Sequence, residues 1–179
     1  MQEKIGNGGY ALGARSLQIR DSLFNLKAFD EKALLAIALD NRALFLKRWQ
    51  QFLLEEVLNE QALAKHNDFK QVKSILLKDE QLSANVDSVS YRLVRNFRIN
   101  VRDLVFSELN ATLIKLDDGY KFRSIQHQIE TPLWQLINQQ NDNFLMRPLS
   151  SWSAVFNEAL QNTIDDMKVG KNQTHQPLN

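Results

Sequence analysis

Arg15 is the side chain of this sequence best placed for chemistry, because it stands where a glycine-rich loop changes into a helix. Four of the six glycines fall within the first thirteen residues, after which an amphipathic helical pattern begins. Glycine lets a backbone approach another surface closely, so this pattern predicts a loop that passes near a surface and ends where the helix starts. Arg15 then lies in about the first helical turn.

Two interpretations of Arg15 follow from this position. The helix dipole disfavours positive charge at a helix N-terminus, so the simpler expectation is an arginine compensated by solvent or by a carboxylate. The other is a functional arginine, whose rigid set of N–H donors would stabilise negative charge that develops during a reaction. The residues alone leave both interpretations open.

The remainder of the chain is patterned for helices that would position such a residue. Apolar residues recur at helical spacing over 11–26, 31–37, 41–58, 69–78, 86–109, 122–140 and 151–170. No stretch alternates in the manner of a strand. The expected fold is therefore all-α, an orthogonal array of six or seven helices with an N-terminal glycine-rich loop. Residues 1–170 are expected to form one helical domain, and residues 171–179 a polar tail.

Capping residues mark several of these helix ends. N-caps are expected at Asp30, at Asp40 or Asn41, at Thr131 before Pro132, and at Ser150 or Ser151, and the last helix is expected to end at Gly170. The aromatic stripe of the third helix, which contains Trp49 and Phe52, is interpreted as packing core rather than as a ligand pocket.

Composition excludes several classes of function. The net charge of +1 gives no general attraction to nucleic acid or to a membrane surface. The chain has no cysteine, which rules out disulfides and thiol chemistry, and no apolar run approaches the length of a membrane span. No cofactor, nucleic-acid partner or membrane span is expected.

The sequence of the first fifty residues is similar to that of a known family. The similarity rests on Gly8-Gly9-Tyr10, Gly13-Ala14-Arg15, Gln18-Ile19-Arg20, Phe29-Asp30, Leu39-Asp40 and Arg42-Ala43-Leu44, and further on Asp87-Ser88-Val89, residues 92–97 and Trp152. This pattern resembles a helical segment in the β-chain of the penicillin acylases (penicillin amidases), which are N-terminal-nucleophile amide hydrolases. The resemblance covers most of the chain and is most specific in its first fifty residues.

The resemblance implies a parent enzyme in the periplasm or cell envelope. Such a parent cleaves acyl-amide bonds of small molecules, such as β-lactams or acyl-homoserine lactones, through a serine at a mature N-terminus. Arg15 would lie beside the active site and support the nucleophile's amine and the oxyanion asparagine. The partners of this chain would be the α-chain and the catalytic core of the β-chain.

The resemblance also implies what this chain lacks. It begins Met1-Gln2, so the reacting serine is expected outside it, and the chain is expected to be a piece of the enzyme. The family's calcium site uses carboxylates near the arginine, whereas no aspartate precedes Arg15 and Glu3 matches poorly, so no metal is expected. Asn7 lies too close to Arg15 to be the oxyanion asparagine.

The main alternative is a self-standing helical module that binds another protein, with the glycine loop as an entry linker. Weaker alternatives are a metal held by His127 and Glu130, a phosphate bound by residues 6–9, and nucleic acid bound along an arginine stripe. That stripe consists of Arg92, Arg95, Arg98 and Arg102, and a solvated or carboxylate-paired face is the simpler interpretation of it.

The absence of the nucleophile gives a direct prediction. The purified chain should show no amide hydrolase activity, because no serine at its N-terminus can attack an amide. The measurement is release of a chromogenic amine from an acyl anilide, compared with a matched blank. Turnover above that blank would overturn the assignment of the chain as the non-catalytic part of an acylase.

Overall fold

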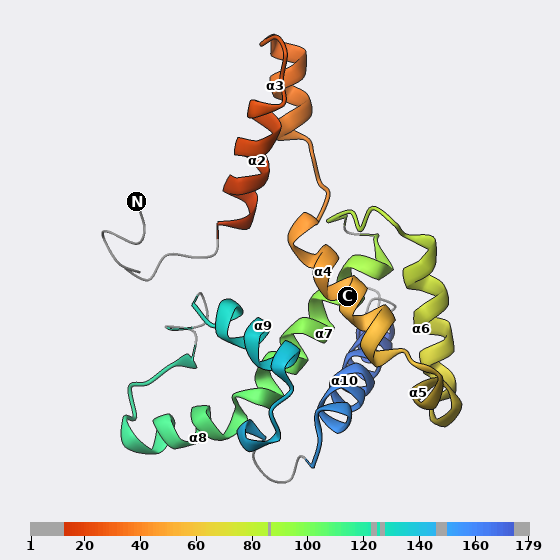
Figure 1. Ribbon diagram of the computed structural model, residues 1–179, viewed down its shortest axis with the longest axis vertical. Helices are drawn as coiled ribbons and strands as arrows, with labels where there is room; N and C mark the ends of the chain where they lie inside the picture. Colours follow the sequence, from red (N-terminus) through yellow and green to blue (C-terminus); the bar gives the residue numbers. More distant parts are fainter. Residues whose placement is uncertain (1–12, 86, 123–124, 126–127, 146–149, 174–179) are drawn as a thin grey trace, which may run out of the picture. The chain divides into compact units, whose positions relative to one another are not determined.

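A computed structural model describes residues 13–85, 87–122, 125, 128–145 and 150–173 of the 179-residue chain. Over these residues the chain forms nine α-helices and no β-strand, and a single isolated bridge joins Arg42 to Ser83. The all-α prediction is confirmed (Figure 1). Among the described helices, none combines the length and the apolar character that crossing a membrane requires.

Contacts within the chain group it into two units, each of them built from two separate stretches. The first unit comprises residues 1–41 and 107–141, and the second comprises residues 42–106 and 142–179. The expectation of one helical domain over residues 1–170 stays a prediction, and the two units are described in turn.

The second unit holds the larger core. Its elements are α4 (Leu44–Phe52), the π-helical turn η1 (Leu53–Val57), α5 (Glu60–Lys65), α6 (Asn67–Lys78), α7 (Val89–Val105), the 3-10 turn η3 (Asp142–Phe144) and α10 (Trp152–Gln173). The helices α7 and α10 pack along one another more extensively than any other pair (Figure 1). Buried apolar residues on α7 follow the helical period, with Leu93 and Val94 together, then Phe97 and Val101. This spacing places them on the face that the helix turns inward.

Aromatic rings connect three helices of this core. Trp49 of α4 is fully buried and meets Phe97 of α7 edge to face, with ring centroids 6.3 Å apart. Phe52 lies on the same face of α4 and meets Phe156 of α10 at 5.0 Å. Each such pair contributes about 0.5–1.5 kcal/mol beyond the burial of its apolar area. The aromatic stripe predicted from the sequence is therefore packing core, as expected.

A buried glutamine determines how the chain leaves α6. The Nε2 of Gln50 donates to the carbonyl oxygens of Leu76 (3.1 Å) and Asp79 (2.8 Å), at the C-terminal end of α6. Lys47, one turn earlier on α4, donates to the carbonyl of Glu80. Carbonyl groups in the last turn of a helix lack the usual i+4 N–H partner, so α4 supplies donors here in addition to the Asp79 N–H, which donates to Leu76 at 3.4 Å.

The loop that follows contains a leucine in an unusual conformation. Leu82 adopts φ 48°, in the left-handed region that non-glycine residues rarely occupy, and its side chain is fully buried. Its N–H donates to Asp79 Oδ1 at 2.9 Å, and its carbonyl accepts from the N–H of Ala43 at 2.9 Å. Burial and hydrogen bonds on both sides hold the strained residue in place.

The first unit contains α2 (Ala14–Phe24), α3 (Glu31–Ala38), α8 (Ser107–Leu116) and α9 (Glu130–Gln139). Gly13 precedes α2 with φ 68°, a conformation that glycine adopts without steric cost. The side chain of Asp30 accepts from the N–H of Ala33 at 2.7 Å, so it caps α3 as predicted. The helices α2 and α3 pack together as a hairpin (Figure 1).

Some predicted helix starts are correct and others are wrong. Ser151 caps α10 by accepting from the N–H of Ala154 at 3.2 Å, as predicted. Asp40 and Asn41 do not cap the next helix, because α4 begins at Leu44, and the Asp40 carboxylate instead accepts from Gln18. Thr131 is not a cap either. The helix α9 starts one residue earlier, which places Thr131 and Pro132 in its first turn, where the missing N–H of proline is tolerated.

Two predicted helix lengths also change. The helix expected over 86–109 is divided at Phe106, whose φ of −102° and ψ of 10° leave helical geometry, and α8 begins at Ser107. Gly170 does not end the last helix, which continues to Gln173. A glycine inside a helix costs about 1 kcal/mol relative to alanine, an amount that does not by itself terminate a helix.

The cap that Gln50 provides can be tested by substitution. Gln50→Leu removes the buried donor to the carbonyls of Leu76 and Asp79, and Leu76 keeps only the bond from the Asp79 N–H, which should destabilise the fold by about 1–3 kcal/mol. The measurement is the midpoint of urea unfolding. Gln51→Leu is the matched control, because Gln51 is exposed on the same helix and should change the midpoint little. Equal midpoints for the two variants would contradict the cap.

Candidate functional site

The guanidinium of Arg15 connects α2 to the end of α3. Its Nη1 donates to the carbonyl of Asp40 (2.5 Å), and its Nη2 donates to the carbonyls of Ile37 (3.1 Å) and Ala38 (3.2 Å). The Nε2 of Gln18, one turn further along α2, donates to the Asp40 carboxylate at 2.8 Å. Two side chains of α2 therefore fix the point where the chain leaves α3.

This arrangement explains how a positive charge is tolerated in the first turn of α2. The C-terminal end of a helix carries partial negative charge on its unpaired carbonyls, and Arg15 places its positive charge against that end of α3. The sequence predicted compensation by solvent or by a carboxylate, whereas the partners are backbone carbonyl oxygens. Three of the five guanidinium N–H donors take part in these bonds.

The hairpin that carries Arg15 exposes several large apolar side chains. No residue of α2 or α3 is buried. Exposed apolar side chains are Leu17, Phe24, Phe29, Leu34, Leu35 and Leu39, with Phe24 at 82% and Leu39 at 70% exposure. We call these six residues the hairpin apolar face. Where exposed apolar side chains form a contiguous patch of several hundred Å², that patch is typical of a surface against which another protein packs.

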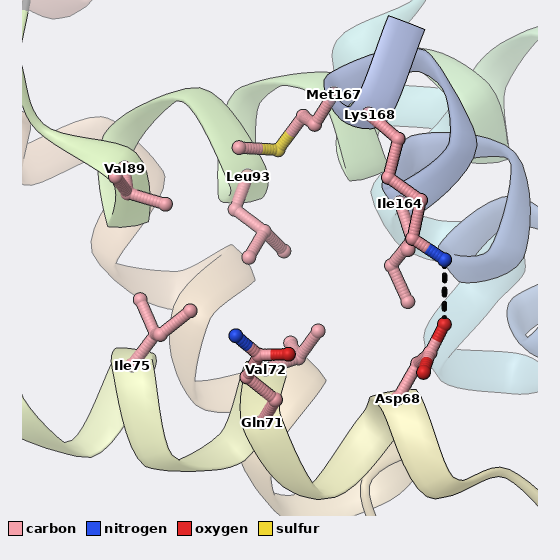
Figure 2. A pocket seen from close by; sticks show the side chains of 9 residues that line it. All are labelled: Asp68, Gln71, Val72, Ile75, Val89, Leu93, Ile164, Met167 and Lys168. Carbon is pink, nitrogen blue, oxygen red and sulfur yellow. Dashed lines mark hydrogen bonds and ion pairs between the residues drawn. The ribbon is translucent and has the colours of Figure 1, made fainter. Parts of the chain in front are cut away.

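A hollow lies within the second unit, between α6, α7 and α10 (Figure 2). Its volume is about 110 Å³. It is lined by Asp68, Gln71, Val72, Ile75, Val89, Leu93, Ile164, Met167 and Lys168. At one side, Lys168 Nζ donates to Asp68 Oδ2 at 2.7 Å, and this hydrogen bond raises the pKa of Lys168. The sequence analysis missed this hollow, because its walls come from helices far apart in the chain.

A second concave surface follows α5 and α6. It is an open cleft of about 410 Å³ whose polar lining is basic, and it is lined by Leu63, Lys70, Lys73, Ser74, Leu77 and Lys78. The Lys73 ammonium group donates to the carbonyl of Leu58 at 3.0 Å, so one of the three lysines stabilises the end of η1.

The predicted arginine stripe is not a uniform basic surface. Arg92 and Arg95 are exposed on α7. The Arg98 guanidinium instead lies 5.3 Å from the centre of the Phe45 ring, and Arg102 pairs with Asp103 at 2.7 Å. Aromatic stacking and carboxylate pairing thus account for half of the stripe, in agreement with the simpler interpretation made from the sequence.

The predicted metal and phosphate residues fall mostly outside the described part of the chain. Outside the described residues lie His127, Glu3 and residues 6–9, which include Asn7. Glu130 is described and is buried at the start of α9. Among the described residues, no group of three or more histidine, aspartate or glutamate side chains is arranged to hold a metal ion. His66 stacks on Phe69 with ring centroids 4.4 Å apart.

The connection through Arg15 can be tested by amide hydrogen exchange. Arg15→Ala removes three bonds from a charged donor, which should lower the local stability of the hairpin by about 1–2 kcal/mol and speed exchange in α3 by about 5–30-fold. Arg20→Ala is the matched control, since Arg20 pairs with its neighbour Asp21 on the same helix. If both variants exchange alike, Arg15 does not hold α3.

No known protein resembles this chain closely enough to assign it a function. Comparison with protein-family models, with curated proteins and with solved structures finds no match to this chain.

Proposed function

We propose that this chain is the helical part of the β-chain of a penicillin acylase-like amide hydrolase. The parent enzyme, exported to the periplasm or cell envelope, would cleave acyl-amide bonds of small molecules through an N-terminal serine that lies outside this chain. The pattern from Gly8 to Arg20 and onward to Leu44 supports the proposal at the level of sequence. The chain itself would have no hydrolase activity.

The observation that carries this proposal is the hairpin apolar face. Phe24, Phe29 and Leu39 are each more than two-thirds exposed, although each would gain about 1.5–3 kcal/mol by full burial. A helical part of a larger enzyme needs such a face, because it must pack against the catalytic core. The segment that most resembles the family is the segment that carries this face.

Arg15 would have a supporting role at the edge of the active site. The carbonyls of Ile37, Ala38 and Asp40 hold its guanidinium in a fixed position. A fixed guanidinium costs little reorganisation when negative charge develops beside it, which is the condition for electrostatic stabilisation. In this proposal Arg15 positions and polarises neighbouring groups of the catalytic core, and it does not itself react.

The second candidate function is a self-standing interaction module, which the same apolar face also favours. The two proposals differ in what covers that face: the rest of the same enzyme, or a separate protein. The gene that encodes the chain distinguishes them. A reading frame that runs upstream through a secretory signal, a spacer and a serine at a processing junction supports the hydrolase. A start codon at Met1 and a stop codon after Asn179 would support the module.

The role of Arg15 is tested in the full-length enzyme. Arg15→Ala and Arg15→Lys should each lower kcat on a chromogenic acyl anilide by on the order of 10²-fold, because lysine keeps the charge but not the fixed set of donors. KM should change less than kcat. Arg20→Ala is the control and should retain activity. Full activity in a folded Arg15→Lys enzyme would contradict the supporting role.

A further inference from the structure

The hollow between α6, α7 and α10 has apolar walls on three sides. Val72 and Ile75 come from α6, Val89 and Leu93 come from α7, and α10 contributes Ile164 and Met167. Figure 2 shows these side chains arranged around an open space, with the charged pair at one side of it. All of these residues belong to the second unit, so the site does not depend on how the two units are arranged.

The size of the hollow limits what it accepts. An engineered cavity of about 150 Å³ lined by Leu, Ile and Phe stays dry and binds benzene. The hollow is somewhat smaller, at about 110 Å³, but its open side leaves room for a substituent on a bound ring. A helix or a peptide segment would not enter it. The occupant that fits is a single small ring or a short branched chain.

The polar groups favour an uncharged occupant. The charges of Asp68 and Lys168 compensate each other across 2.7 Å, and Asp165 lies 3.9 Å from the same ammonium group. An anion would meet two carboxylates there, and a cation would meet the ammonium. The third polar group is Gln71, whose amide lies on the α6 side of the hollow and offers both a donor and an acceptor (Figure 2).

We propose that this hollow is a binding site for a small uncharged ring compound that carries one hydroxyl group, of which phenol is the simplest example. The ring packs against Val72, Leu93 and Ile164, and the hydroxyl exchanges a hydrogen bond with the Gln71 amide. Burial of the ring supplies the affinity, and the single hydrogen bond orients the molecule. This site is separate from the hairpin that carries Arg15, and it goes beyond the proposed hydrolase function.

The test is fluorine NMR with 4-fluorophenol titrated into the full chain. Wild-type protein should bind saturably with a Kd on the order of 1 mM, the affinity typical of a weak small-ligand contact. Ile75→Phe places a ring in the hollow and should weaken binding at least tenfold. Asn162→Phe is the matched control, since Asn162 is exposed on α10 and lies outside the hollow and the second cleft, and it should bind as wild type does.

A second variant that fills the hollow keeps the test valid if the first variant does not fold. A pair of probes with and without a hydroxyl group tests the hydrogen bond to Gln71. Met167→Phe fills the hollow from α10 and should also weaken binding if Ile75→Phe does not fold.

Gln71→Leu should weaken binding of 4-fluorophenol about fivefold and leave binding of fluorobenzene unchanged. Absence of saturable binding by the wild type, or undiminished binding by a folded filled variant, would overturn the site. An equal loss of both probes in Gln71→Leu would overturn the role of the amide.

Discussion

The carbonyl groups at the ends of α3 and α6 need donors from outside their own helices, and the connections of this protein depend on where those donors come from. Gln50 and Lys47 reach from α4 to the end of α6, and Arg15 reaches from α2 to the end of α3. In each case a long polar side chain of one helix fixes the direction in which another helix ends. The loop through Leu82 depends on the first of these connections. Gln50 holds the carbonyl of Asp79, and the carboxylate of Asp79 in turn accepts from the N–H of Leu82.

The two donors differ in their surroundings, and the difference affects their energetic weight. Gln50 is 3% exposed, so its amide works where water does not compete for the carbonyls. Arg15 is exposed, and solvent can replace part of what its loss removes. The same type of contact should therefore contribute less to stability on the hairpin than in the core.

What the sequence predicted well is local in the chain. The helical class, the caps at Asp30 and Ser151 and the burial of Trp49 and Phe52 each follow from residues a few positions apart. The partners of Arg15 were not predictable in this way, because backbone carbonyls 22 to 25 residues away carry no mark in the sequence. The hollow was still less predictable. Asp68 and Lys168 are 100 residues apart, and only tertiary packing brings them together.

The incorrect helix boundaries have a similar origin. Asp40 has the residue type of a cap, but its carboxylate is engaged by Gln18, and α4 starts only at Leu44. Gly170 has the residue type of a helix stop, yet α10 passes through it. Helix propensity describes the conformation that a residue favours in the absence of tertiary contacts, and tertiary contacts worth a few kcal/mol override that preference.

The division of the second unit into two stretches has a consequence for how the protein is made. Residues 42–106 are synthesised well before α10, which follows only after residues 107–141 have been made. Until then Phe52 lacks the ring of Phe156 against which it packs, and α7 lacks the helix with which it packs most extensively. Contacts between such distant stretches form slowly, and apolar surface that waits for its partner invites aggregation. The core of the second unit is therefore complete only once both of its stretches are present.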